Sequence, residues 1–120
     1  MSLIRTLGKL FLSCIFITSG AQIFLTPGNR VKIVEKAGIP EPEQAVELNG
    51  AAMVVGGTLL AVDIAPRLAA TVLIGALVPT TLVGHAFWKE ETEAGRKAQR
   101  TQFMKNLGLI GGLLLVLAGK

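Results

Sequence analysis

The sequence predicts an all-α membrane protein: an up-down four-helix transmembrane bundle with a short interfacial helix between helices one and two. Composition is the first reason, because 51% of the residues are hydrophobic and only 17% are charged, whereas soluble domains carry about a quarter charged residues. The mean hydropathy is +0.58. Four apolar segments also follow one another along the chain, and backbone groups in lipid must pair within their own segment, which favours helices. We treat residues 1–120 as a single domain.

Each apolar segment predicts one helix. The first covers residues 3–25, and the second and third cover about 46–64 and 67–88. All three are near the ~20 residues that cross ~30 Å of hydrocarbon. The fourth covers about 101–119, but its uninterrupted apolar part starts only at Leu107. The preceding stretch "EETEAGRKAQRTQ" is rich in helix formers, so we expect one helix that begins there, near the headgroups, and then enters the bilayer.

The connections carry their own signals. The stretch "NRVKIVEKAG" predicts the short interfacial helix, closed by Gly38. In the loop "DIAPR", Pro66 suits the first turn of the third helix, and we expect Asp63 to pair with Arg67. Pro79 lies inside the third helix, where it removes a backbone hydrogen bond and predicts a kink.

Alternating helix directions would bring one polar residue from every helix to a similar depth. These residues are Gln22, Asn49, His85 and Asn106, with Thr80 and Thr81 about one turn deeper and Trp88 at the interface. Three interpretations stay open. The side chains hydrogen-bond across helices and fix the bundle, or they line a pocket for a polar headgroup such as a quinone, or they dock another subunit. In each case we expect the four side chains to face the bundle interior.

Several classes of function are disfavoured. The net charge is +4, but the basic residues form no dense stripe and the chain has no tyrosine, so we expect no nucleic-acid partner. Cys14 is the only cysteine, which argues against a disulfide or a thiol–quinone exchange centre. His85 is the only histidine, and we expect no metal site. No sequence motif predicts catalytic residues.

The order of these features resembles the DoxX family of small four-helix bacterial membrane proteins. The resemblance is carried by "LGKLFLSCIFITSGAQIF", "KAGIPEPEQAVELNGAAMVVGGTLLAV", "APRLAATVLIGALVPTTLVGHAFW" and "RTQFMKNLGLIGGLLLVLAG", which together extend over nearly the whole chain. The "PTT…GH.FW" block is closest to the actinobacterial type of member.

This resemblance implies a membrane redox context. Named DoxX-type proteins are associated with a thiosulfate–quinone oxidoreductase and with detoxifying oxidoreductases at the membrane. We therefore expect a non-catalytic accessory or assembly subunit of a redox or respiratory-type complex, with other membrane subunits or a second copy as partners. The alternative is a small quinone-binding oxidoreductase component with its headgroup site around His85 and Asn106.

The expected location is the inner (cytoplasmic) membrane, which the chain crosses several times. The two long loops carry more Lys and Arg than the termini and the short loop, and the positive-inside rule then places the long loops in the cytoplasm. The basic tails typical of the family favour the opposite orientation. Both orientations stay open.

Overall fold

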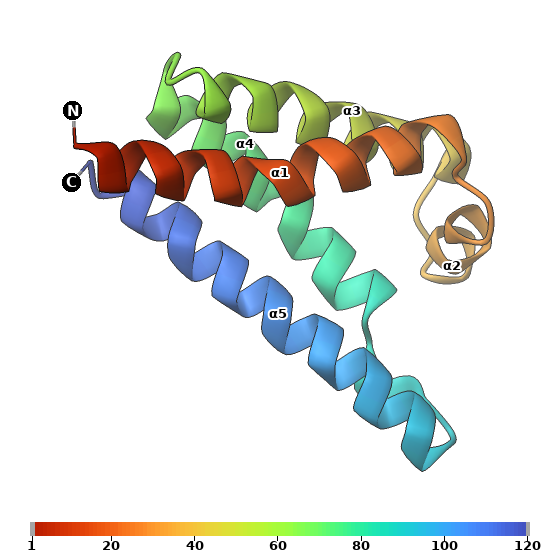
Figure 1. Ribbon diagram of the computed structural model, residues 1–120. Coiled ribbons are helices and arrows are strands. Elements are labelled where there is room, and N and C mark those ends of the chain that lie inside the picture. Colours follow the sequence, from red (N-terminus) through yellow and green to blue (C-terminus); the bar gives the residue numbers. More distant parts are fainter. Residues whose placement is uncertain (1, 120) are drawn as a thin grey trace.

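The computed structural model describes residues 2–119, which are helical and contain no β-strand (Figure 1). The all-α prediction is confirmed. The elements are α1 (Leu3–Leu25), α2 (Arg30–Lys36), α3 (Pro42–Ala61), α4 (Pro66–Pro79), the π-helical turn η1 (Thr80–Gly84), the 3₁₀ turn η2 (Phe87–Lys89) and α5 (Glu93–Leu117).

Local chemistry explains where the helices begin. The hydroxyl of Ser2 accepts a bond from the backbone N–H of Arg5 and caps α1. Thr92 caps α5 in the same way through the N–H of Gly95. Helices α3 and α4 instead begin with Pro42 and Pro66, because proline lacks the N–H that the first turn would leave unpaired. Thus α3 begins before the predicted residue 46, and α5 well before the predicted residue 101.

The helices pack in sequence order. Helix α1 contacts α3, α3 contacts α4, and α4 contacts α5, with directions that alternate (Figure 1). The two chain ends lie close together at one end of the molecule. Toward the other end of the molecule, α4 and α5 diverge from α1 and α3, and α2 lies beside the beginning of α3. The molecule measures 46 × 30 × 20 Å.

The core follows a regular stripe on α3, formed by Val46, Gly50, Met53, Gly57 and Leu60. This stripe meets buried residues of α1 and α4. At the α1–α3 crossing, Gly20 faces Gly50 so closely that a Cβ on Gly20 would lie 2.7 Å from the Gly50 carbonyl oxygen. Glycine at both positions lets the two backbones approach each other. By contrast, a Cβ on Gly108 of α5 would meet nothing within 4 Å, so no close approach of another helix requires glycine there.

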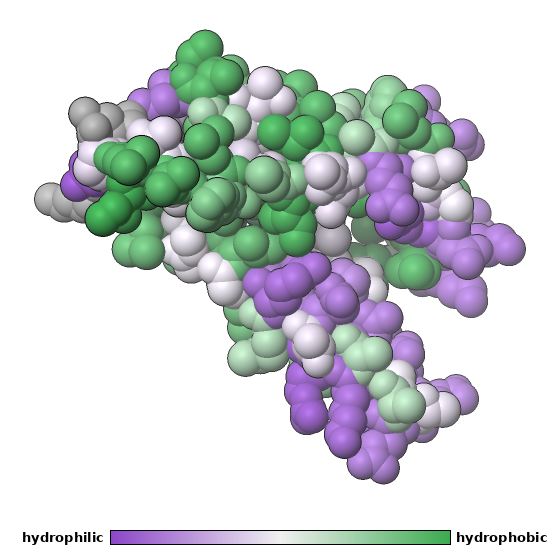
Figure 2. All heavy atoms as spheres, in the orientation of Figure 1, coloured by the Kyte–Doolittle hydropathy of each residue, from purple (hydrophilic) through white to green (hydrophobic). Residues whose placement is uncertain are grey.

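Much of the outer surface is apolar (Figure 2). Exposed large side chains include Ile4, Phe11, Leu48, Val55 and Leu115. Among the described residues, two segments are long and apolar enough to cross a membrane, Leu3–Leu25 and Pro66–Lys89. The first half of α5 is different, because its charged and polar side chains form a hydrophilic arm that extends from the apolar body (Figure 2).

Candidate functional site

The polar region centres on the break at the end of α4. Pro79 has no N–H to donate and its ring crowds the preceding turn, and the α-helix gives way there to the π-helical turn η1. The helix then stops, because His85 adopts φ −125° and ψ 44°. The helix is therefore disturbed at Pro79 through a change from α- to π-helical geometry, and the predicted helix to residue 88 ends earlier than expected.

At this break, Thr80 and Thr81 connect the end of α4 to α3 and α5 through hydrogen bonds. Each hydroxyl donates to a carbonyl of its own helix, Thr80 to Ala76 at 2.9 Å and Thr81 to Leu77 at 2.7 Å. Each hydroxyl oxygen also accepts from an asparagine on a neighbouring helix. The Nδ2 atom of Asn49 on α3 donates to Thr80 at 2.8 Å, and that of Asn106 on α5 donates to Thr81 at 3.0 Å. Neighbouring helical residues point about 100° apart, so the two threonines reach two different helices.

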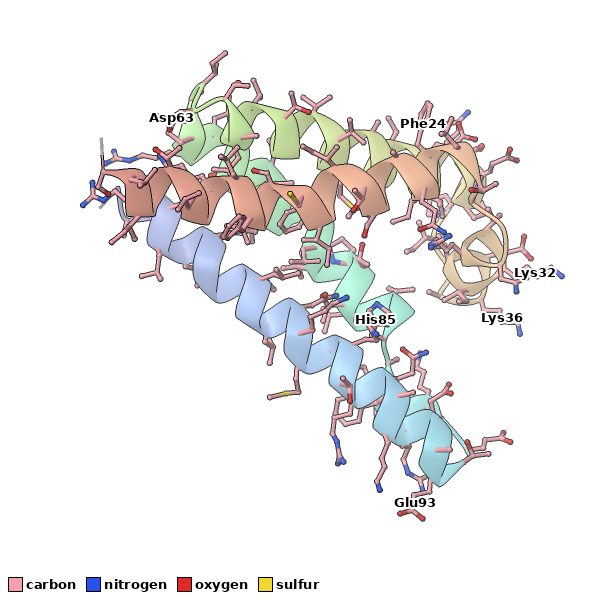
Figure 3. The ribbon with its side chains drawn as sticks, in the orientation of Figure 1. Phe24, Lys32, Lys36, Asp63, His85 and Glu93 are labelled. Atoms are coloured by element: carbon pink, nitrogen blue, oxygen red, sulfur yellow. The ribbon has the colours of Figure 1, made fainter. Side chains whose placement is uncertain are left out.

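His85 is held by a residue that the sequence did not single out. Its Nδ1 lies 2.7 Å from Oε1 of Gln99 on α5, and a carbonyl oxygen cannot donate, so Nδ1 carries the proton in this arrangement. Nε2 then remains as an acceptor in the neutral ring. The half-buried His85 points from the chain after η1 toward the region between α5 and α2 (Figure 3).

The role of Gln99 could have been predicted from the residue at which α5 begins. Once the helix begins at Glu93, Gln99 falls two turns before Asn106 on the same face, since seven residues make nearly two full turns. The sequence placed the helix at about residues 101–119 with a start among the headgroups, and Gln99 lay outside the polar residues predicted to share one depth.

The four predicted site residues do not form one layer. Asn106 is buried, and Asn49 and His85 are half-buried. The side chain of Gln22 is exposed, so its expected inward orientation is wrong. The buried positions of α1 are Ser13, Phe16, Gly20 and Ile23, and Gln22 falls off that stripe.

Asn49, Thr80 and His85 line a pocket of about 670 Å³ between α2, α3 and η1. Arg30 of α2 lines it as well, and its apolar walls include Ile23, Ile33, Val34, Val46 and Val83. The pocket has the size of typical small-molecule sites and their mixture of apolar walls with few polar groups. Asn106 does not line it, because its amide is directed to Thr81 instead.

Three aromatic rings pack together between η2 and the first half of α5. Phe87, Trp88 and Phe103 pack edge to face with ring centroids 5.2–5.9 Å apart. Trp88 is 51% exposed.

At the opposite end, Asp63 pairs with Lys9 of α1 at 2.6 Å and not with Arg67 as the sequence suggested. Asp63 sits in a left-handed turn with φ 59°, which turns its carboxylate toward α1. No group of three or more His, Cys, Asp and Glu side chains within residues 2–119 could hold a metal ion.

A family model described as DoxX matches residues 4–86, more than half of the 120 residues. The chain belongs to the DoxX family. No curated protein and no solved structure matches it. The DoxX match covers α1 to η1 and ends at Ala86, so α5 resembles the family only through the residues quoted above. Family membership and the apolar helices identify this DoxX protein as a membrane protein.

Proposed function

We propose that this DoxX protein is a multi-pass inner-membrane protein that serves as a non-catalytic accessory or assembly subunit of a membrane redox complex. Its four long helices cross the bilayer, and α2 lies at the surface. The family resemblance supplies the redox context. One observation carries the structural role: the amides of Asn49 and Asn106 are both engaged in bonds that join helices.

Those bonds favour a scaffold for a physical reason. A buried amide without a partner is costly, and a buried amide that bonds a neighbouring helix fixes the packing of both helices. Two of the four candidate residues are engaged in this way. The exposed apolar side chains of α1 and α3, such as Phe11 and Val55, then face lipid or the apolar helices of partner subunits.

Mild-detergent extraction from the native membrane, followed by native electrophoresis and mass spectrometry of the band, tests the role. We expect the tagged chain to migrate in a larger assembly together with oxidoreductase subunits. The Gly20→Leu variant, which disrupts the α1–α3 crossing, serves as a control that should lose these partners. A wild-type chain that migrates alone, with no redox protein beside it, rules out the accessory role.

A second candidate function rests on the pocket that His85 lines. We propose it as a headgroup site for a quinone or quinol, within a protein that takes part in quinone redox chemistry. Nε2 of the neutral His85 ring would accept from a quinol hydroxyl, and the Arg30 guanidinium would donate to a quinone carbonyl. The structure changes the expected residue set, because Arg30 and Asn49 line the pocket whereas Asn106 and Gln22 do not. Electrons would come from a partner subunit.

Quenching of Trp88 fluorescence by a short-chain quinone tests this candidate, since Trp88 is the only tryptophan and lies three residues after His85. Saturable quenching that His85→Ala and Arg30→Gln abolish would support the site. Gln22→Ala provides a matched control, because Gln22 is polar and lies outside the pocket. Quenching that rises linearly with quinone, and equally in all variants, would reject it.

A further inference from the structure

A second pocket, of about 750 Å³, lies at the opposite end of the molecule from His85. Its walls come from the first turns of α1, the loop between α3 and α4, the start of α4 and the end of α5. The polar groups in its lining are Arg5, Lys9, Asp63 and Arg67. None of these residues takes part in the site proposed for quinone.

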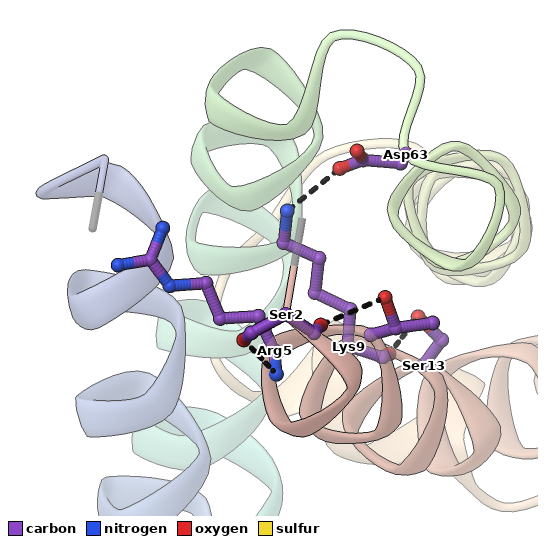
Figure 4. Close-up of polar contacts among 6 residues, drawn as sticks. Ser2, Arg5, Lys9, Ser13 and Asp63 are labelled. Atoms are coloured by element: carbon purple, nitrogen blue, oxygen red, sulfur yellow. Dashed lines mark hydrogen bonds and ion pairs between the residues drawn. The ribbon is translucent and has the colours of Figure 1, made fainter.

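The pocket carries an excess of positive charge. The Lys9 ammonium and the Asp63 carboxylate neutralise each other at 2.6 Å (Figure 4). Within the described part of the chain, the guanidinium groups of Arg5 and Arg67 have no ion-pair or hydrogen-bond partner. The Arg5 side chain extends toward α5 (Figure 4). Both guanidinium groups line the pocket and are therefore available to an anion that enters it.

The Lys9–Asp63 pair gives this end a fixed geometry. It joins α1 to the loop between α3 and α4, and the Lys9 side chain is only 15% exposed. Asp63 is therefore occupied by Lys9 and does not neutralise either arginine. Guanidinium is the planar group that binds phosphate through two parallel hydrogen bonds.

Below the charged groups, the pocket is apolar. Leu12 of α1 faces Leu115 and Val116 of α5 across it. Gly8 recesses the wall on the α1 side, since a Cβ there would meet nothing within 4 Å. The site therefore combines a cationic rim with a hydrocarbon-lined groove that opens between two helices.

We propose that this pocket holds an anionic phospholipid, with its phosphate between Arg5 and Arg67 and an acyl chain in the groove between α1 and α5. Both halves of the site are needed for this assignment. A free phosphate would use the arginines alone, whereas a neutral lipid or detergent would use the groove alone. The inference is independent of any redox partner.

Native mass spectrometry of the full chain tests the proposal, with phosphatidylglycerol and phosphatidylcholine of identical acyl chains supplied in competition. We expect the wild type to retain phosphatidylglycerol selectively. The Arg5→Gln/Arg67→Gln variant, which loses two basic side chains, should bind it roughly thirtyfold more weakly. Lys97→Gln/Arg100→Gln removes the same charge from the exposed arm of α5 and should leave selectivity unchanged.

Two further measurements separate the alternatives. Gly8→Leu fills the groove without touching the arginines, and we expect it to weaken lipid retention in a chain that keeps its Lys9–Asp63 pair. Glycerol phosphate, which has the anionic group without acyl chains, should bind much more weakly than the lipid. Equal retention of both lipids by the wild type, unchanged selectivity in the double arginine variant, or glycerol phosphate binding as tight as the lipid would each overturn the proposal.

Discussion

Thr80 and Thr81 are adjacent in the sequence, yet their hydroxyls hold two different helices. Each hydroxyl donates to a backbone carbonyl one turn earlier, so its oxygen is oriented to accept from an asparagine. The buried pair is Thr81 and Asn106, which are 2% and 3% exposed. Because Asn106 is buried, its amide relies on the Thr81 hydroxyl for a hydrogen-bond acceptor.

Replacing Thr81 by valine removes the acceptor while keeping the shape of the side chain. We expect Thr81→Val to lower the free energy of unfolding by about 1–2 kcal/mol, because the Asn106 amide becomes a buried donor without a partner. Thermal unfolding in mild detergent measures it. Thr71→Val is the control, since the exposed Thr71 hydroxyl bonds only the Arg67 carbonyl of its own helix; an equal loss in both variants would contradict the interhelical role.

The sequence predicts how deep a polar residue lies more reliably than it predicts which way the residue faces. Asn49, His85 and Asn106 were expected to face inward, and all three are buried or half-buried, whereas Gln22 at a similar depth is exposed. Rotation about a helix axis changes by about 100° per residue, so one residue off the stripe is enough to reverse the outcome. In α1, exposed positions such as Phe11 and Phe24 are as apolar as the buried Phe16 and Ile23, so hydrophobicity alone does not mark the buried stripe.

At the level of elements, α1 and α3 approach each other closely where they cross. Gly20 and Gly50 face each other there, and each would place a Cβ under 3 Å from the backbone of the opposing helix. A backbone carbonyl cannot move aside as a flexible side chain can. The two helices would have to separate along their length.

We therefore expect Gly20→Val to destabilise the protein by about 1–3 kcal/mol or more, the usual range for overpacking. Gly108→Ala should be neutral or slightly stabilising, because its Cβ would enter open space and alanine favours the helix by up to about 1 kcal/mol. Chemical unfolding followed by circular dichroism compares them. If Gly108→Ala cost as much as Gly20→Val, the difference in packing between the two crossings would be refuted.

Element boundaries could be predicted where the local chemistry is strong. Helix α1 ends at Leu25, before Pro27, and α4 begins at Pro66, both as the sequence indicates. The end of α4 could not be placed, because Pro79 permits either a kinked helix or a termination. What distinguishes them is tertiary: the bonds of Thr80 and Thr81 to α3 and α5 stabilise the π-helical turn.

For the whole molecule, the sequential packing places both chain ends and the α3–α4 loop together, opposite α2 and the loop before α5 (Figure 1). Membership of the DoxX family does not say which of these two ends faces the cytoplasm. The two long loops carry more Lys and Arg than the end with the termini. At that second end, the ion pair of Lys9 and Asp63 joins α1 to the loop between α3 and α4.

Thiol labelling in intact cells tests this arrangement. In a Cys14→Ala background, we expect Ile64→Cys and Ala118→Cys to share one accessibility to a membrane-impermeant maleimide, and Lys36→Cys and Glu91→Cys to share the opposite one. All four residues are exposed, so accessibility is set by the side of the membrane. Permeabilised cells, in which all four should react, provide the control. Mixed labelling within either pair would refute the alternating crossings.

The hydrophilic arm of α5 has a consequence for the bilayer itself. The longest uninterrupted stretch of that helix without a charged side chain is residues 106–117, which is about 18 Å long at 1.5 Å per residue. The hydrocarbon layer is about 30 Å thick. In the proposed arrangement, in which α5 crosses the bilayer, this mismatch would require the layer to thin beside α5 or another protein surface to cover the helix there, and thinning costs a fraction of a kcal/mol per ångström. The protein should therefore partition into thinner regions of the membrane when it is alone, and into assemblies when partners are present.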